Sequence, residues 1–132
     1  MENPRRLERE RVLSLLYEAE MKGQTVDELL AELPTQPERF VVDLMKGVDA
    51  AAVALDAEIS ARATNWDIDR IAAIDRLIMR IGVWELQNRP DLPIAVVISE
   101  AVELAKTFST DESGKFVNGV LSAVSSHRKA SS

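Results

Sequence analysis

The chain has 132 residues, which is enough for one domain or for two small subdomains that share a core. It contains no cysteine, so disulfides and cysteine metal sites are excluded, and this absence agrees with a reducing cytoplasm. The formal net charge of −6 argues against indiscriminate nucleic-acid binding and suits a basic protein partner, and no apolar run approaches the roughly 20 residues that a membrane-spanning helix needs.

The first part of the chain is patterned as helices. Asn3 and Pro4 suit the N-cap and the first position of a helix that is expected to run to about Lys22. Thr25 and Glu28 have the spacing of a capping box, which predicts a short second helix. A third helix is expected after two prolines, with one apolar face made of Val41, Leu44, Val48, Ala51, Leu55 and Ile59.

The segment Thr64–Trp66 is the expected joint between two halves of the chain. It separates an N-terminal subdomain of about residues 1–63 from a C-terminal subdomain of about residues 66–128, within a single domain of residues 1–132. A fourth helix follows the joint, with apolar residues at helical spacing at Ile71, Ile74, Ile78 and Ile81. No stretch alternates as a strand does, and the short connections between helices favour an all-α bundle.

The segment Ile94–Leu121 holds two amphipathic helix patterns joined by the polar loop Thr107–Lys115. The first pattern has Ile94, Val97, Ala101, Leu104, Ala105 and Phe108 on one face. The second has Phe116, Val117, Val120, Leu121 and Val124 on one face. Ser113 is the expected N-cap of the last helix. The position of Phe108 on the apolar face of the first pattern predicts that its side chain is buried. Phe116 is the better candidate for an exposed side chain.

The apolar stripes predict the side chains of the core. The residues expected to be mostly buried are Val41, Leu44, Val48, Leu55, Ile71, Ile74, Ile78, Val97, Leu104, Val120 and Leu121. Within the last helix, Gly119 is expected to permit a close approach of another helix, and Asn118 to bond a buried backbone group.

Three segments carry a resemblance to a known family, and they fall in the family's order. EAVELAK, followed by a short loop and KFVNGVL, resembles the C-terminal signature of the NusB transcription antitermination factors. LLYEAE at Leu15–Glu20 and IDRLIMRIGVWEL at Ile74–Leu86 are similar to earlier parts of the family's sequences. The resemblance spans nearly the whole chain. It implies an all-α bundle of about six to seven helices in two packed three-helix subdomains.

Arg5, Arg6 and Arg9 form the first candidate site, because they fall within a sector of about 100° on the first helix. The residues alone favour a solvated helix end interlaced with glutamates, and cations at a helix N-terminus also oppose the macrodipole. The resemblance implies instead that these arginines bind RNA, where each guanidinium can hold a phosphate with two hydrogen bonds.

Phe108, Glu112, Lys115 and Phe116 form the second candidate site. RNA-binding proteins stack unpaired bases on aromatic rings and position phosphates with lysine. The alternative is that both rings only close the core at a helix–loop–helix junction. The resemblance implies that this loop belongs to the RNA-contacting surface of the family.

Asp69, Asp75 and Glu85 form the third candidate site, and Tyr17, Asp69 and Asp75 are assigned to a protein partner. The resemblance implies that the acidic start of the fourth helix helps to hold a basic partner, the small ribosomal protein that acts as NusE. The alternative is that these acids serve the helix N-terminus or pair with neighbours.

Catalysis and cofactors find no support in the sequence. One histidine and no cysteine remove the common nucleophile–base pairs, and neither a Gly-rich phosphate loop nor a metal-ligand spacing is present. We therefore expect a protein that is not an enzyme and that needs no cofactor.

The resemblance implies an RNA-binding adaptor of the cytoplasm. With NusE it would recognise single-stranded boxA RNA in nascent ribosomal RNA transcripts and join the RNA polymerase elongation complex with other Nus factors. Two alternatives remain open. One is a structural oligomerising helical protein without an RNA role, and the other is a stand-alone relative of the RNA-binding domain of ribosomal RNA cytosine methyltransferases.

Overall fold

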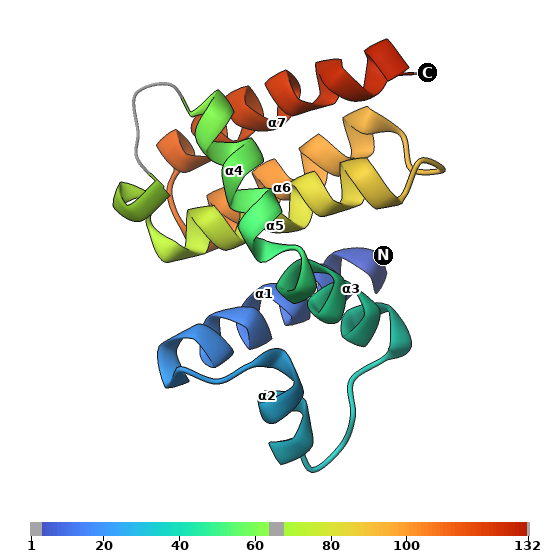
Figure 1. Cartoon of the computed structure of the whole chain (residues 1–132), viewed down its shortest axis with the longest axis vertical. Helices are drawn as coiled ribbons and strands as arrows, with labels where there is room; N and C mark the ends of the chain where they lie inside the picture. Colours follow the sequence, from blue (N-terminus) through green and yellow to red (C-terminus); the bar gives the residue numbers. More distant parts are fainter. Residues whose placement is uncertain (1–3, 64–67, 132) are drawn as a thin grey trace. The chain divides into compact units, whose positions relative to one another are not determined.

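A computed structural model describes residues 4–63 and 68–131 of the chain, with side chains as far as Ser126. These residues form seven α-helices and one short 3₁₀ helix, and they contain no strand, which confirms the all-α prediction (Figure 1). None of the described helices is long and apolar enough to cross a lipid bilayer. The chain divides into two compact units, Met1–Ala50 and Ala51–Ser132.

The first unit consists of α1 (Pro4–Lys22), α2 (Val26–Glu32) and α3 (Arg39–Ala50). The three helices pack against one another in pairs, so each covers part of the apolar stripes of the other two. This burial supplies most of the stability that short helices lack on their own.

Local sequence signals set the turn between α1 and α2. Gly23 has a positive φ of 65°, and the N–H of Gln24 donates to the carbonyl of Ala19 at 2.9 Å, which closes α1 in a left-handed cap. The capping box of α2 is present: Glu28 N–H donates to Thr25 Oγ1 at 3.1 Å, and Thr25 N–H donates to the Glu28 carboxylate at 2.9 Å. The hydrogen bond from the Thr25 backbone lowers the pKa of Glu28 from its usual 4.5.

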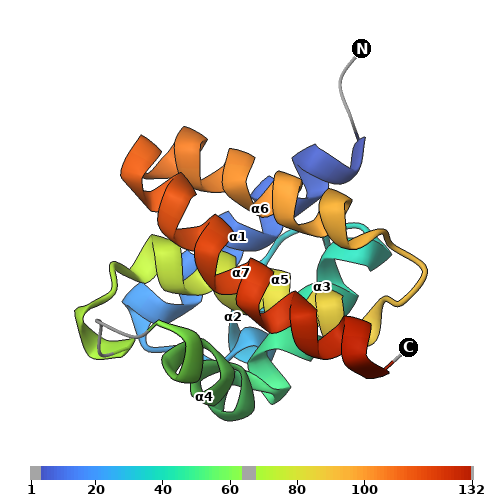
Figure 2. The ribbon, with the colours of Figure 1, turned by 90° about the horizontal axis from the view of Figure 1, so that it is seen from above.

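The second unit consists of α4 (Ala52–Arg62), the 3₁₀ helix η1 (Ile68–Arg70), α5 (Ala73–Asn88), α6 (Ile94–Phe108) and α7 (Asp111–Ser131). Figure 2 shows α6 and α7 side by side as an antiparallel pair. Both pack against α5, while α4 runs across α5 and also contacts α7 (Figure 1).

The third helix of the sequence prediction is wrong in one respect, because the chain bends at Ala51 and forms two helices there. Ala51 has φ −100° and ψ 7°, and α4 begins at the next residue. No proline or positive φ lies at this bend. The cause is tertiary: the apolar stripe of α3 packs on α1 and α2, whereas the stripe of α4 packs on α5 and α7.

The division into compact units therefore falls between Ala50 and Ala51. The joint expected at Thr64–Trp66 lies outside the described residues, as does the expected N-cap Asn3. A joint at that position stays a prediction.

The apolar stripes are buried as expected. Of the predicted core residues only Ile74 is half-buried, and the others are buried. The expectations for Asn118 and Gly119 are wrong, because both residues are exposed and a Cβ at Gly119 would meet no atom within 4 Å. The close helix approach occurs at Gly82 of α5 instead, where a Cβ would lie 2.7 Å from Cδ1 of Leu121.

Gly82→Ala should destabilise the protein. Alanine gains helix propensity of about 1 kcal/mol over glycine, but overpacking typically costs about 1–3 kcal/mol. The new Cβ would lie 2.7 Å from Cδ1 of the fully buried Leu121, which would have to shift. We expect a lower melting temperature for Gly82→Ala. Gly119→Ala is the matched control, because it makes the same change in an open helical position and should not destabilise. Equal melting shifts for the two variants would contradict the close approach.

Candidate nucleic-acid interface

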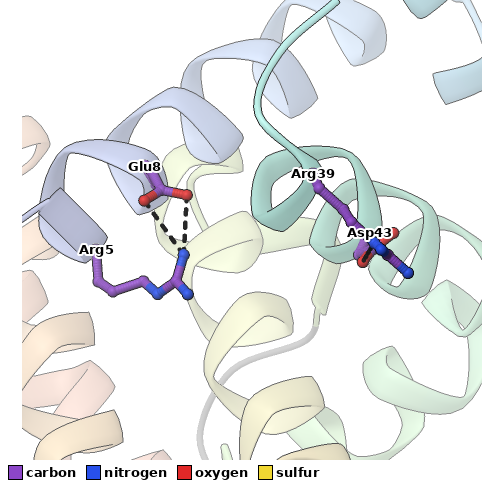
Figure 3. A network of polar contacts seen from close by, with 4 residues as sticks. All are labelled: Arg5, Glu8, Arg39 and Asp43. Atoms are coloured by element: carbon purple, nitrogen blue, oxygen red, sulfur yellow. Dashed lines mark hydrogen bonds and ion pairs between the residues drawn. The ribbon is translucent and has the colours of Figure 1, made fainter.

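The N-terminal end of α1 holds its first arginine in a defined place. Nη1 of Arg5 donates to the two carboxylate oxygens of Glu8 at 3.0 and 3.2 Å (Figure 3). The guanidinium carbon of Arg5 also lies 4.1 Å from the centroid of the Phe40 ring on α3, well within cation–π range. The Arg5 side chain is still 56% exposed. The guanidinium is thus supported on one face and at one edge while it remains accessible.

The other two arginines of this end differ in burial. Arg6 is exposed, whereas Arg9 is only 4% exposed and its guanidinium carbon lies 5.6 Å from the centroid of the same Phe40 ring. Arg5 and Arg9 are one helical turn apart and so share the side of α1 that meets α3. The role of Arg9 in RNA binding stays a prediction.

Phe40 is the residue that the sequence reasoning missed at this end. Nothing in its local pattern links it to the arginines, because the contact joins two helices that are far apart in the chain. Only the packing of α3 on α1 creates it.

Tyr17 lies on an exposed apolar side of α1. It is 38% exposed, and Leu7 and Met21 are 48% and 56% exposed. At about 100° per residue these three side chains fall within a sector of about 80°. Leu7 and Met21 were also missed, although large apolar residues outside the buried stripe of a helix are a readable sign of a contact surface.

In the second unit, α7 begins differently from the prediction. Ser113 N–H donates to Thr110 Oγ1 at 2.9 Å, so Thr110 is the N-cap and the helix starts at Asp111. The prediction of Ser113 as N-cap is wrong because the Ser113 hydroxyl has another partner, the carboxylate of Asp75.

A small network of hydroxyls ties this loop to α5. Ser113 Oγ donates to Asp75 Oδ2 at 2.8 Å, and the hydroxyls of Ser109 and Thr110 lie 2.9 and 3.0 Å from Ser113 Oγ. Asp75 is only 8% exposed, and its other oxygen, Oδ1, has no hydrogen-bond partner among the described residues. The network holds the loop against the start of α5, and it leaves one buried acceptor unsatisfied.

A cavity of about 590 Å³ lies beside this network. Its lining residues come from η1, α5 and α7, and they are Arg70, Ile71, Ala72, Asp75, Glu112, Ser113, Lys115 and Phe116. The structure therefore brings three of the four residues of the second candidate site together in one wall. Lys115 Nζ lies 3.2 Å from Glu112 Oε1, and both side chains are largely exposed, so this ion pair adds little stability.

The expected exposure of the two phenylalanines is reversed. Phe116 is half-buried in the cavity wall, whereas Phe108 is 46% exposed at the end of α6. Phe108 is the last residue of α6. Phe116 lies nearly two turns into α7, since the helix begins at Asp111, and its ring reaches toward η1 and α5.

The two acids assigned to a partner also differ. Asp69 lies exposed on η1, whereas Asp75 is buried and bonded to Ser113. Among the described residues, no group of three or more His, Cys, Asp or Glu side chains is placed to hold a metal ion.

Ser113→Ala should destabilise the second unit by about 1–3 kcal/mol, because the buried Asp75 carboxylate would lose its hydrogen bond. Urea unfolding measures the change. Ser126→Ala is the matched control in the same helix: its hydroxyl only bonds the carbonyl of Ala123 at an exposed position, so a change within about 0.5 kcal/mol is expected. An equally small effect for Ser113→Ala would show that the network does not hold the loop.

Comparison with known proteins agrees with the resemblance. Residues 6–126 match the NusB family. A transcription antitermination protein NusB from Sorangium cellulosum is 41% identical over 122 residues, which cover 88% of this chain and 87% of that protein.

Solved structures show the same fold. The structure of T. maritima NusB matches with a TM-score of 0.82 and 31% identity, over 96% of this chain and 93% of that chain. A crystal structure of the antitermination factors NusB and NusE in complex with dsRNA matches with a TM-score of 0.78 and 25% identity, over 93% of this chain and 96% of that chain. These relatives are antitermination factors and not enzymes, in agreement with the prediction. The chain belongs to the NusB family of transcription antitermination proteins.

Proposed function

We propose that the chain binds single-stranded boxA RNA together with a basic ribosomal protein that acts as NusE. In this function it joins the RNA polymerase elongation complex with other Nus factors, in the cytoplasm, on nascent ribosomal RNA transcripts. The similar solved complex of NusB, NusE and dsRNA supports NusE and RNA as the two kinds of partner.

The observation that carries the proposal is the wall formed by Lys115 and Phe116. The half-buried ring borders a cavity of about 590 Å³, which exceeds the volume of one nucleobase, and the exposed lysine stands beside it. An aromatic face offers stacking to an unpaired base, and a neighbouring cation offers a phosphate contact. Exposed Phe108 supplies a second ring for the same loop.

The exposed arginines of α1 supply the phosphate contacts of the proposal. Arg5 and Arg6 are both accessible, and guanidinium groups hold phosphate oxygens through paired N–H donors. Because the whole chain carries a net charge of −6, few phosphates are neutralised and the affinity depends only weakly on salt.

The partner contacts are assigned to exposed Asp69 and Tyr17. An acidic surface speeds the encounter with a basic protein, and a half-exposed tyrosine gives an apolar anchor with a polar end. Asp75 is buried, so its contribution to this surface passes through the loop that it holds.

Phe116→Ala should weaken binding of a boxA single strand by roughly 1–3 kcal/mol if a base stacks on the ring. Phe116→Tyr is the matched control, because it keeps the aromatic face. The titration is done with the basic partner present, and thermal melting checks that both variants fold. Parent-like binding by Phe116→Ala would place the base contact elsewhere and favour a structural protein without an RNA role.

Arg6→Ala should weaken binding of boxA and scrambled single strands about equally, because a phosphate contact carries no sequence information. The slope of log affinity against log salt should become shallower by about 0.7 for the one lost contact. A loss confined to the boxA strand would contradict a phosphate role. A duplex of the same sequence, titrated in parallel, tests the preference for single strands.

Asp69→Lys should slow association with the basic partner and weaken the complex, most strongly at low salt. Asp91→Lys makes the same charge change at another exposed aspartate of the second unit and should have a smaller effect. Stopped-flow association at two salt concentrations measures both variants. Equal association rates for the two variants would remove Asp69 from the partner surface.

A further inference from the structure

Phe40 contacts two of the arginines of the first candidate site through its ring. Its ring lies under the guanidinium of Arg5 at 4.1 Å and within 5.6 Å of the guanidinium of Arg9. We propose that Phe40 is a positioning residue for RNA binding, which holds the Arg5 guanidinium in the orientation that meets a phosphate. This inference rests on the proposed function, in which Arg5 contacts RNA.

Stacking suits this role because it uses the face of the guanidinium and leaves the N–H donors in its plane. Phosphate recognition uses those in-plane donors, so one arginine can stack on a ring and bind a phosphate at the same time. Arg5 meets both conditions, since it lies over Phe40 and its side chain is 56% exposed.

Arg5 also lies at a position where its side chain needs contacts to stay ordered. It is the second residue of α1, at a helix end that frays easily and whose dipole repels cations. Glu8 offsets part of this repulsion at 3.0 Å (Figure 3). The Phe40 ring on α3 adds an attraction. A flexible arginine loses conformational entropy when a phosphate immobilises it, and a side chain that is already ordered loses less.

The neighbouring cation of α3 offers a comparison within the same unit. Arg39 directly precedes Phe40 in the chain, its side chain is 94% exposed, and it pairs with Asp43 at 3.6 Å (Figure 3). Phe40 could instead affect RNA binding by changing the stability of the whole unit. In that case the loss of the Phe40 ring would weaken RNA binding by the same factor whether Arg5 or Arg39 is also removed.

A double-mutant cycle tests the proposal, with a uridine- and adenine-rich boxA-type single strand and the basic partner present. Phe40→Leu should weaken binding about two- to fivefold, the range of an exposed cation–π contact, and should leave the salt slope unchanged because no charge is lost. Phe40→Tyr keeps the ring and should restore parent affinity. In the Arg5→Ala background Phe40→Leu should have almost no further effect, whereas its effect should add fully to that of Arg39→Ala.

A second measurement follows Arg5 in the free protein. NMR relaxation of the Arg5 Nε–H should report a less ordered side chain in Phe40→Leu and an unchanged one in Phe40→Tyr. Thermal melting confirms that each variant is folded.

The outcomes separate this proposal from the proposed function. Equal weakening by Phe40→Leu with and without Arg5, or no weakening although Arg5→Ala weakens binding, would overturn the positioning role alone. Parent-like binding by Arg5→Ala would instead show that the phosphate contact of the proposed function is wrong, and the RNA role of Phe40 would fail with it. The relaxation measurement would still report the stack.

Discussion

The buried hydrogen bond between Ser113 and Asp75 is the contact on which the candidate RNA loop depends. It joins the first turn of α7 to the first turn of α5, with 2.8 Å between Ser113 Oγ and Asp75 Oδ2. The hydroxyls of Ser109 and Thr110 also bond the Ser113 oxygen. The cavity that Phe116 and Lys115 line also has both partners of this hydrogen bond in its wall. Further along both helices, the absence of a side chain at Gly82 lets α7 lie close to α5. The two helices are therefore in close contact at Leu121 as well as at Ser113. The cost of this arrangement is the buried Oδ1 of Asp75, which has no hydrogen-bond partner in the part of the chain that the structure describes.

Most of the fold could be predicted from the sequence because its signals are local. The apolar stripes follow from helical spacing alone, and the capping box of Thr25 and the glycine stop at position 23 act within one turn of the chain. The bend at Ala51 could not be predicted in this way. Its stripe continues without a breaker, and only the different packing partners of α3 and α4 separate the two helices.

The candidate site was predictable in its members and not in their surroundings. Arg9, Asp75 and Phe116 are of the residue types that surface sites use, yet each is at least partly buried, because a helix from elsewhere in its own unit covers it. Two hydroxyls competed for the N-cap of α7, and the outcome depended on a carboxylate 38 residues away from Ser113. Burial and competition for hydrogen-bond partners depend on how the helices of the unit pack. The helical spacing of apolar residues in the sequence does not predict them.

The charge arrangement explains why such a protein would act with a partner. Two exposed cations of the candidate sites are each paired with an acid: Arg5 with Glu8 and Lys115 with Glu112. In the proposed function each acid would reduce the net positive potential that a phosphate meets, so each contact would contribute a modest free energy and the lone protein would bind RNA weakly. Neighbouring acids would also make RNA binding selective. An RNA strand would gain binding free energy only where its phosphates reach the in-plane N–H donors of an arginine that is already oriented. A basic partner would supply the missing positive charge. The net negative charge that would weaken RNA binding by the lone protein would also attract that partner.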